Sequence, residues 1–433
     1  MSATQQPSSC QGSHFAGICS RRQLLQGGLG AGLSLSIPFW QQRSRLQAGV
    51  SPSRPYKQCI LLWMNGGPSH LDTFDPKPGT REGGPFRSIK TRIPGVEISE
   101  HLPRVAEQAH QMAILRSMTS KEGNHDRGQY LMHTGYIPAG SFRHPSLGAW
   151  VSHERTDVAL DLPHFVSING PSIGAGFLGV EHQPYTVLDP KNGMNNVAYP
   201  KDLNASRFSR RQEAFAFLQG QFQQQTQLPA VASQNKVYQQ ATSLMHSPLV
   251  SAFDLEEETS QMRAKYGEHD FGRGCLMARR LIESGVPFVE VMLDGWDTHY
   301  DNFAAIEHLL GLLDPAMSTL LEDLDQRDLL DDTLVIWMGE FGRTPRISAN
   351  DGRDHYPAAW SAVLAGGGVR AGQAYGATDE IGAKVVRDAV TVPNFFATVA
   401  TLLGMDPDKE VYSPQGRPIR ISDSGTPIHS LIA

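Results

Sequence analysis

The sequence predicts an α/β fold with a doubly wound, mainly parallel sheet that has helices on both faces. Short apolar runs that end at Gly, Asp or Asn indicate strands buried on both faces. Amphipathic segments lie between several of these runs, and this alternation is typical of a parallel sheet with crossover helices. The 433 residues are 40% hydrophobic and 19% charged. This is ordinary globular composition, so an apolar core can hold the fold together.

Four apolar runs are the predicted strands. They cover residues 58–64, 286–293, 333–338 and 361–365. Two amphipathic segments, 272–284 and 303–324, are predicted to be helices because apolar residues recur there at helical spacing. In open α/β sheets ligands bind beyond the carboxyl ends of the strands, so the residues that follow each strand are the candidates for function.

The domain organisation follows from where the strand pattern stops. Residues 207–263 are rich in Gln and carry no strand pattern, so we expect a helical insertion there. A Pro- and Ser-rich linker covers 51–56. We therefore expect an export signal and linker over 1–50, followed by one α/β domain over 51–433 that contains the insertion.

The N-terminal segment resembles an export signal. Ser-Arg-Arg-Gln-Leu-Leu at 20–25 is similar to the twin-arginine motif, and a weakly apolar run without acidic residues extends to residue 40. This run is shorter than the roughly 20 residues that cross a bilayer as a helix. The motif implies recognition by the twin-arginine export machinery and a location in the periplasm or cell envelope, with membrane attachment only through an uncleaved signal. That route carries folded proteins, which favours a protein with a metal already inserted.

Charge and cysteine usage exclude several classes of protein. The 38 Lys and Arg residues do not outnumber the 44 Asp and Glu residues, so there is no net basic field for binding nucleic acid. Cys10 and Cys19 lie in the predicted signal, and Cys59 and Cys275 are far apart. Such spacing makes neither a disulfide framework nor a structural zinc site.

Acidic, amide and histidine side chains follow three of the predicted strands. In chain order they are Asn65, Asp72, Asp297, His299, Glu340 and His355. Because the carboxyl ends of parallel strands meet at one edge of a sheet, we expect these side chains to form a metal site. Carboxylates combined with imidazoles favour Zn or Mn over Ca or Mg. The alternative is that Asp297 caps the following helix and that the histidines are solvated.

Three motifs follow the predicted strands or extend from them: Leu-Trp-Met-Asn-Gly-Gly-Pro-Ser-His-Leu-Asp at 62–72, Gly-Trp-Asp-Thr-His at 295–299 and Gly-Glu-Phe-Gly-Arg-Thr-Pro at 339–345. Together they resemble a bacterial family known only as domain of unknown function 1501. The resemblance covers about residues 58–404 and implies membership of the alkaline-phosphatase-like superfamily, which includes sulfatases. It also implies one metal held by Asp297, His299 and His355. A second metal would use Glu340 with Asp72 or Asn65.

The same resemblance indicates where a nucleophile would lie. Met-His-Thr-Gly at 132–135 is similar to the end of the sulfatase nucleophile segment, and counting back leads to His125 rather than to Ser or Cys. Formylglycine chemistry is therefore not supported. His125 is a candidate ligand, general acid or covalent nucleophile, with Thr119 and Ser120 as alternative nucleophiles. Arg343 is a candidate to hold an oxoanion bidentately, or to form an ion pair with a nearby carboxylate.

These features lead to two hypotheses about function. The first is an exported, metal-dependent hydrolase of phosphate or sulfate esters that acts on a small-molecule or glycan oxoanion ester, with water as the attacking group. The alternative is a catalytically inactive relative that binds an anionic glycan or a cell-envelope component.

Overall fold

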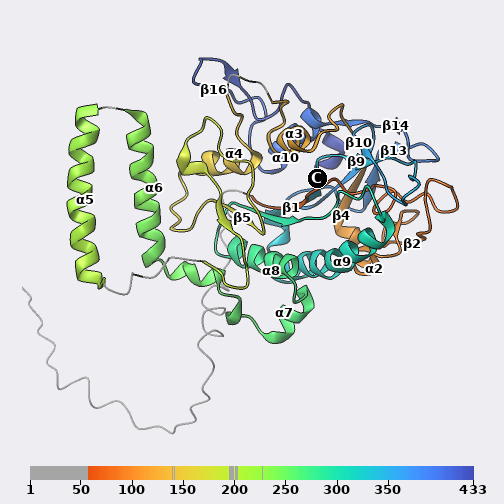
Figure 1. Cartoon of the computed structure of the whole chain (residues 1–433), viewed down its shortest axis with the longest axis horizontal. Helices are drawn as coiled ribbons and strands as arrows, with labels where there is room; N and C mark the ends of the chain where they lie inside the picture. Colours follow the sequence, from red (N-terminus) through yellow and green to blue (C-terminus); the bar gives the residue numbers. More distant parts are fainter. Residues whose placement is uncertain (1–56, 139, 141, 195–198, 200–202, 227) are drawn as a thin grey trace, which may run out of the picture. The chain divides into compact units, whose positions relative to one another are not determined.

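The computed structural model (Figure 1) describes residues 57–433, except for 139, 141, 195–198, 200–202 and 227. The chain divides into two units, Met1–Ser53 and Arg54–Ala433, and all described residues belong to the second. The predicted twin-arginine motif at 20–25 and the linker at 51–56 lie outside the described residues. Within the described residues, no helix combines the length and apolar character that crossing a bilayer requires.

A nine-stranded sheet forms the centre of the second unit, with strand order β12-β4-β11-β8-β1-β7-β5-β6 and β15 beside β4. The strands are β1 (Gln58–Met64), β4 (Met112–Thr119), β5 (Phe165–Ile168), β6 (Tyr185–Val187), β7 (Phe288–Leu293), β8 (Thr333–Met338), β11 (Trp360–Gly366), β12 (Gln373–Tyr375) and β15 (Val390–Thr391). The five strands from β8 to β6 are parallel, and β11 is antiparallel to both of its neighbours. This mostly parallel sheet confirms the predicted fold class.

Strand β1 lies at the middle of the sheet, and all seven of its residues are buried. Its side chains alternate between two apolar cores. Leu62 belongs to one core and Trp63 to the other. Because successive residues of a strand point to opposite faces, a continuous apolar run is stable only where both faces are covered.

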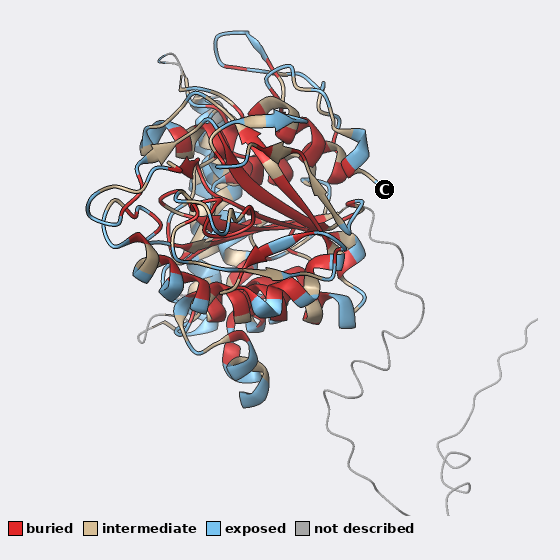
Figure 2. Cartoon of the chain, turned by 90° about the vertical axis from the view of Figure 1, so that its right-hand side faces the viewer, coloured by how far each residue is buried: buried red, intermediate tan, exposed pale blue. Residues whose placement is uncertain are grey.

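Helices cover both faces of the sheet, and Figure 2 shows the buried strands between the two helical layers. One layer contains α2 (Pro103–Gln108), α7 (Ser260–Tyr266), α8 (Asp270–Glu283) and α9 (Asn302–Gln326). The other contains α3 (His125–Thr134), α4 (Leu147–Glu154) and α10 (Val392–Leu402). The helices predicted at 272–284 and 303–324 are thus confirmed as α8 and α9.

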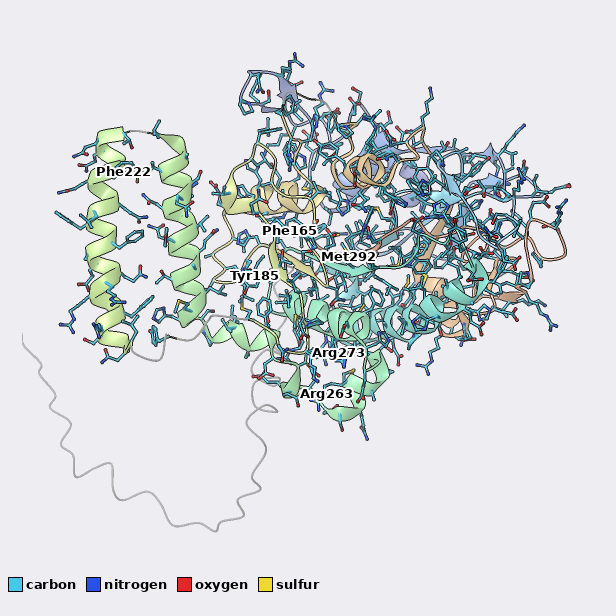
Figure 3. All side chains as sticks on the ribbon, viewed as in Figure 1. Phe165, Tyr185, Phe222, Arg263, Arg273 and Met292 are labelled. Atoms are coloured by element: carbon cyan, nitrogen blue, oxygen red, sulfur yellow. The ribbon has the colours of Figure 1, made fainter. Side chains whose placement is uncertain are left out.

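Two further helices precede α7. Helix α5 (Ala205–Thr226) has no buried residue, and it packs on α6 (Pro229–His246) through Phe215 and Tyr238, whose rings lie 4.6 Å apart. Phe222 of α5 is exposed and is labelled in Figure 3. Short 3-10 helices at Pro248–Phe253 and Leu255–Glu257 follow. Among the described residues of 207–263 there is no strand.

Four small two-stranded ribbons lie outside the main sheet. They are β2 (Ser88–Lys90) with β3 (Glu97–Ser99), β9 (Gly342–Arg343) with β10 (His355–Tyr356), β13 (Ala377–Thr378) with β14 (Val385–Arg387), and β16 (Val411–Tyr412) with β17 (Pro418–Ile419). The β9–β10 ribbon follows β8 along the chain, so it starts at the carboxyl edge of the sheet.

Candidate metal centre

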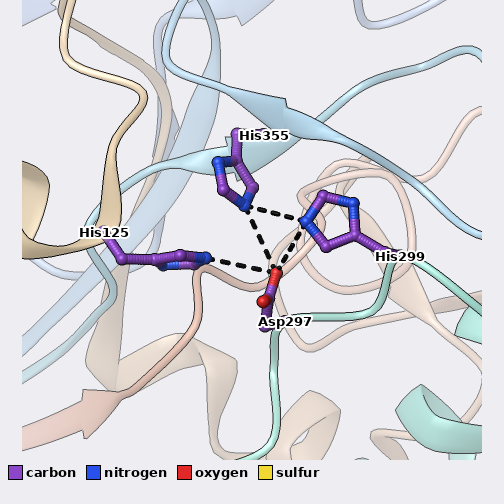
Figure 4. A group of neighbouring side chains, drawn as sticks. All are labelled: His125, Asp297, His299 and His355. Atoms are coloured by element: carbon purple, nitrogen blue, oxygen red, sulfur yellow. Dashed lines mark hydrogen bonds and ion pairs between the residues drawn. The ribbon is translucent and has the colours of Figure 1, made fainter.

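Four side chains converge at the carboxyl edge of the sheet: His125, Asp297, His299 and His355. Each offers one nitrogen or oxygen atom, and these four atoms all lie within 4.8 Å of one another. Figure 4 shows the three imidazole rings directed at the carboxylate of Asp297. The cluster therefore joins parts of the chain that are more than 200 residues apart in sequence.

The ends of β1 and β7 position Asp297. The backbone N–H of Trp296 donates to the carbonyl of Asn65 at 3.1 Å, which brings the two strand ends together. Gly66 lies against this turn with φ of 113°, and a side chain there would collide with the backbone nitrogen of Asp297. Only glycine combines that backbone conformation with so close an approach, which explains the Gly-Gly after β1.

Two local structures supply the remaining histidines. His125 is the first residue of α3, and the side chain of Asn124 caps that helix by accepting from the backbone N–H of Arg127 at 3.2 Å. His355 pairs with Arg343 in the β9–β10 ribbon. The cap and the ribbon fix the directions from which the two imidazoles enter the cluster.

Each imidazole donates its Nδ1 proton to a different acceptor. The Nδ1 atom of His125 lies 2.8 Å from the Glu340 carboxylate, that of His299 lies 3.1 Å from Asp354, and that of His355 lies 2.8 Å from the carbonyl of Gly123. Because carboxylates and carbonyls accept hydrogen bonds, these contacts place the proton on Nδ1 and the lone pair on Nε2 in a neutral ring. This is the arrangement found in histidines that bind metals.

The three Nε2 atoms meet at Oδ1 of Asp297. Their distances to that oxygen are 3.2 Å for His125, 3.1 Å for His299 and 3.3 Å for His355. The Nε2 atoms of His299 and His355 are 2.9 Å apart, and Nε2 of His125 is buried without a hydrogen-bond partner. Neutral rings thus direct lone pairs at a carboxylate, and either a cation or additional protons must balance them.

The spacing of these atoms suits a metal ion. Four ligand atoms at about 2.0–2.1 Å from a tetrahedral zinc ion lie about 3.3 Å from one another. The contacts of Asp297 span 3.1–3.3 Å, the Nε2 atoms of His299 and His355 are 2.9 Å apart, and all four atoms lie within 4.8 Å of one another. Three imidazole nitrogens and one carboxylate oxygen are also the donor types that zinc binds. The residues present therefore fit a four-coordinate divalent ion.

Electrostatics within the cluster keep the carboxylate ionised. Partial burial acts to raise the pKa of Asp297, but the hydrogen bond and charge of Arg343, together with the positive charge that His125 and His299 carry when they are protonated, lower it to about 2. The hydrogen bond to Glu340 raises the pKa of His125, and burial lowers the pKa of His355. At neutral pH the site therefore has an anionic oxygen available for a cation.

Glu340, predicted as a ligand, lies one contact away from the cluster. Its side chain is fully buried, and Oε1 accepts from the Gly66 N–H at 2.9 Å as well as from His125. Its other oxygen is buried without a hydrogen-bond partner. Glu340 thus orients His125, and it reaches the four converging atoms only through that ring.

Arg343 is buried and its donors are engaged within the protein. It donates to the carbonyls of Gly66, Gly67 (3.0 Å) and Arg353 (3.1 Å), and to Oδ1 of Asp297 at 2.6 Å. Arg343 therefore forms an ion pair with a nearby carboxylate, that of Asp297, which is the second of the two roles expected for it. Holding an oxoanion bidentately needs a free guanidinium fork, which these contacts do not leave.

Asn65 and Asp72 have partners outside the cluster. The amide of Asn65 donates to Asp294 at 2.8 Å, and its oxygen accepts from Gln129 at 2.6 Å. The buried carboxylate of Asp72 accepts two hydrogen bonds from Arg353, at 2.8 and 3.1 Å. Neither residue joins the group of four, so the described part of the chain brings together one group of side chains that could hold a metal ion.

Two residues that orient histidines of this site, Asp354 and Gly123, were not predicted from the sequence. The residues proposed as alternative nucleophiles, Thr119 and Ser120, are not part of the cluster. Asp354 orients His299, and its position beside His355 was the available signal. Gly123 contributes only a carbonyl, which no sequence pattern reveals. Thr119 and Ser120 line a separate cavity of about 570 Å³.

The fold and the site define a class of protein. It is an α/β protein with three histidines and one aspartate clustered at the carboxyl edge of its sheet. The chain belongs to the family described as "Protein of unknown function (DUF1501)", whose profile matches residues 56–432. No curated protein matches the sequence.

Solved structures resemble the chain at low sequence identity. Ps i-CgsB in complex with k-i-k-neocarrahexaose is 12% identical over 81% of this chain and 72% of that one, with a TM-score of 0.42. The PsFucS1 sulfatase from Pseudoalteromonas sp. is 13% identical over 84% and 70%, with a TM-score of 0.35. A protein in the alkaline phosphatase superfamily from Vibrio parahaemolyticus is 13% identical over 81% and 67%, with a TM-score of 0.35.

Proposed function

We propose that the protein is an exported, metal-dependent hydrolase of phosphate or sulfate esters, in which the cluster of four binds one divalent cation. The observation that carries this proposal is that the Nε2 atoms of three imidazoles lie within 3.3 Å of one ionised carboxylate oxygen. Nitrogen donors favour Zn or Mn over Ca or Mg. The motifs that contain Asp297, His299 and Glu340 resemble a family placed in the alkaline-phosphatase-like superfamily, and this resemblance is what suggests ester hydrolysis.

The chain's own residues prepare the site for hydrolysis. A bound cation of this kind would polarise an ester oxygen and lower the pKa of a water molecule. Glu340 and Asp354 hold two of the rings, and Arg343 holds the carboxylate. Among the described residues, no Ser, Thr or Cys side chain is hydrogen-bonded to the cluster, which favours attack by water over a covalent nucleophile.

Metal analysis and an ester panel test this proposal. We expect purified protein to contain about one Zn or Mn per chain and to hydrolyse at least one phosphate or sulfate ester. A chelator should abolish both, and the metal should restore both. A metal-loaded protein that cleaves no ester would leave the alternative of a non-catalytic protein that binds an anionic glycan or envelope component. Protein without metal after reconstitution would exclude the proposed centre.

Export is a separate part of the proposal and rests on Arg21 and Arg22. Replacing both with Lys keeps the charge but removes the guanidinium groups that the twin-arginine machinery reads. We expect the double variant to stay in the cytoplasm, as measured by fractionation. Normal export of that variant would contradict this assignment without affecting the metal centre.

A further inference from the structure

A large cavity borders the same helix as the candidate metal centre. Its volume is about 840 Å³, and it lies between Tyr130 of α3, the segment 142–144 and the segment 172–176. This volume is within the range of about 300–1,000 Å³ that small-molecule and cofactor sites occupy. The metal-binding cluster does not account for it, because none of the four ligand residues lines it.

The cavity and the cluster are neighbours at one edge of the sheet. Tyr130 follows His125 by five residues, which is about 7.5 Å along a helix. The segment 172–176 follows β5, and β5 pairs in parallel with β7, the strand that leads to Asp297. Adjacent strands are about 4.8 Å apart. The cavity and the cluster therefore lie at the same edge of the sheet, beside neighbouring strands.

A buried network holds one wall of the cavity. Glu290 lies fully buried in the middle of β7, and its two oxygens contact His133 at 3.2 Å and the hydroxyl of Ser172 at 2.5 Å. Ser172 lines the cavity. Because its proton is donated inward, its oxygen can only accept a hydrogen bond from a ligand, such as one from a hydroxyl group.

The other wall carries an unpaired positive charge. Arg143 is exposed, and no ion pair or side-chain hydrogen bond of Arg143 is found within the described residues. Burial lowers the pKa of the adjacent His144, so that ring is neutral at pH 7. No Asp or Glu is among the described lining residues. The cavity is therefore suited to an anionic group.

The remaining lining groups are aromatic and polar. The rings of Phe142 and Tyr130 border the space, and the Tyr130 hydroxyl is fixed by accepting from the backbone N–H of His144 at 2.6 Å. Apolar ring surface beside a few fixed polar groups suits a ligand with C–H faces and hydroxyls. Arg143 adds a guanidinium, which matches sulfate or phosphate bidentately. A sugar that carries an oxoanion combines these features.

We propose that this cavity is the subsite for the glycan part of the substrate, with Arg143 paired to a sulfate or phosphate group on a sugar next to the one that is hydrolysed. This inference rests on the proposed function and narrows it. The substrate is then an oligosaccharide with more than one oxoanion, rather than a small isolated ester.

Binding measurements on the full chain, purified after incubation with Zn or Mn and with its metal content determined, test the subsite. The probes are sulfated and phosphorylated oligosaccharides of several backbones, their neutral parents, and inorganic sulfate. For the charged oligosaccharides that wild-type protein binds, we expect Arg143→Ala to weaken binding at least about 10-fold, because it removes a charge-assisted contact. Arg143→Lys should give an intermediate loss. Arg92→Ala, which removes an equally positive exposed side chain elsewhere, should bind as wild type does.

Two outcomes would overturn the proposal. One is equal affinity of Arg143→Ala and wild type for every charged oligosaccharide. The other is no binding of any charged oligosaccharide to wild-type protein, or binding no tighter than that of inorganic sulfate. Failure of the proposed hydrolysis looks different. In that case wild type binds the charged oligosaccharides in an Arg143-dependent way but contains no metal or cleaves none of them.

Discussion

Asp72 and Asp297 both come after central strands and both contact a buried arginine, but their other neighbours are of opposite kinds. Asp72 is fully buried, and hydrogen-bond donors from Arg353 and Asn302 surround it. The side chain of Asp297 is 46% exposed, and three imidazole nitrogens with available lone pairs face it. A carboxylate surrounded by donors is already satisfied, whereas one that faces three imidazole nitrogens beside its arginine can also take part in binding a metal cation. The polarity of the neighbours thus distinguishes the two roles.

The largest expected effect is on folding, at Asp72. Asp72→Ala leaves the guanidinium of Arg353 buried without its carboxylate, which typically costs about 3–5 kcal/mol. We expect the free energy of unfolding of the metal-free protein in urea to fall by that amount. Metal bound per folded chain should stay at the wild-type level, because Asp72 contacts none of the four ligand residues.

Asp325→Ala is the matched control, because this acid is exposed on α9. It should change stability by no more than about 0.5 kcal/mol. If Asp72→Ala folds normally but loses its metal, Asp72 is a ligand and the contrast with Asp297 is wrong.

The second expected effect is on metal binding, at His355. His355→Ala removes one of the four proposed ligand atoms. Losing only a residue that supports a ligand typically lowers metal affinity about 10–100-fold, and we expect a larger loss here. Metal should stabilise wild type by about 2.7 kcal/mol at a concentration of 100 times Kd, and the variant should show little of this gain. Thermal unfolding with metal and with chelator measures the difference.

His110→Ala is the control for this change, since His110 is exposed and contacts only a backbone carbonyl. It should bind metal as wild type does. Equal metal content in wild type and His355→Ala would remove the basis for the proposed centre.

Local pattern was sufficient to predict the central strands. Strands β1, β7 and β8 are apolar throughout most of their length and end at Gly, Asp or Asn, so their positions followed from the sequence. The predicted strand at 361–365 is β11, but its antiparallel direction was not predictable. Direction depends on how the chain returns through the β9–β10 ribbon, and this is a tertiary property.

The candidate site was predictable to the extent that its residues follow strand ends. Asp297, His299 and His355 were expected to lie together, and the structure brings them together. The sequence did not reveal that Glu340 forms a hydrogen bond with Nδ1 of His125, because this contact depends on how α3 packs against the end of β8. Nor did the sequence reveal that Arg353 forms an ion pair with Asp72, since an arginine pairs with whichever carboxylate the fold brings near it.

The third expected effect concerns the partner of a ligand. Glu340→Gln keeps the size of the side chain and an oxygen for the Nδ1 proton of His125, but it removes the charge that makes this ring more basic. Losing such support typically lowers metal affinity about 10–100-fold, and we expect about 10-fold because one hydrogen bond can be retained. Competition against a zinc-binding dye at fixed pH measures this. Wild-type affinity would show that Glu340 does not act on the metal through His125.

The smallest expected effect is that of Asp354→Asn, the same carboxylate-to-amide change at the other supporting acid. Asp354 is 73% exposed and Glu340 is fully buried. Water can replace a weakened acceptor at the exposed Asp354 more readily than at Glu340, whose side chain is fully buried. We therefore expect Asp354→Asn to lower metal affinity less than about 10-fold in the same competition assay. If Asp354→Asn costs more than Glu340→Gln, solvent exposure does not set the strength of this support. The orientation of His299 would then limit metal binding. In that case we expect His299→Ala to lower metal affinity more than His355→Ala does.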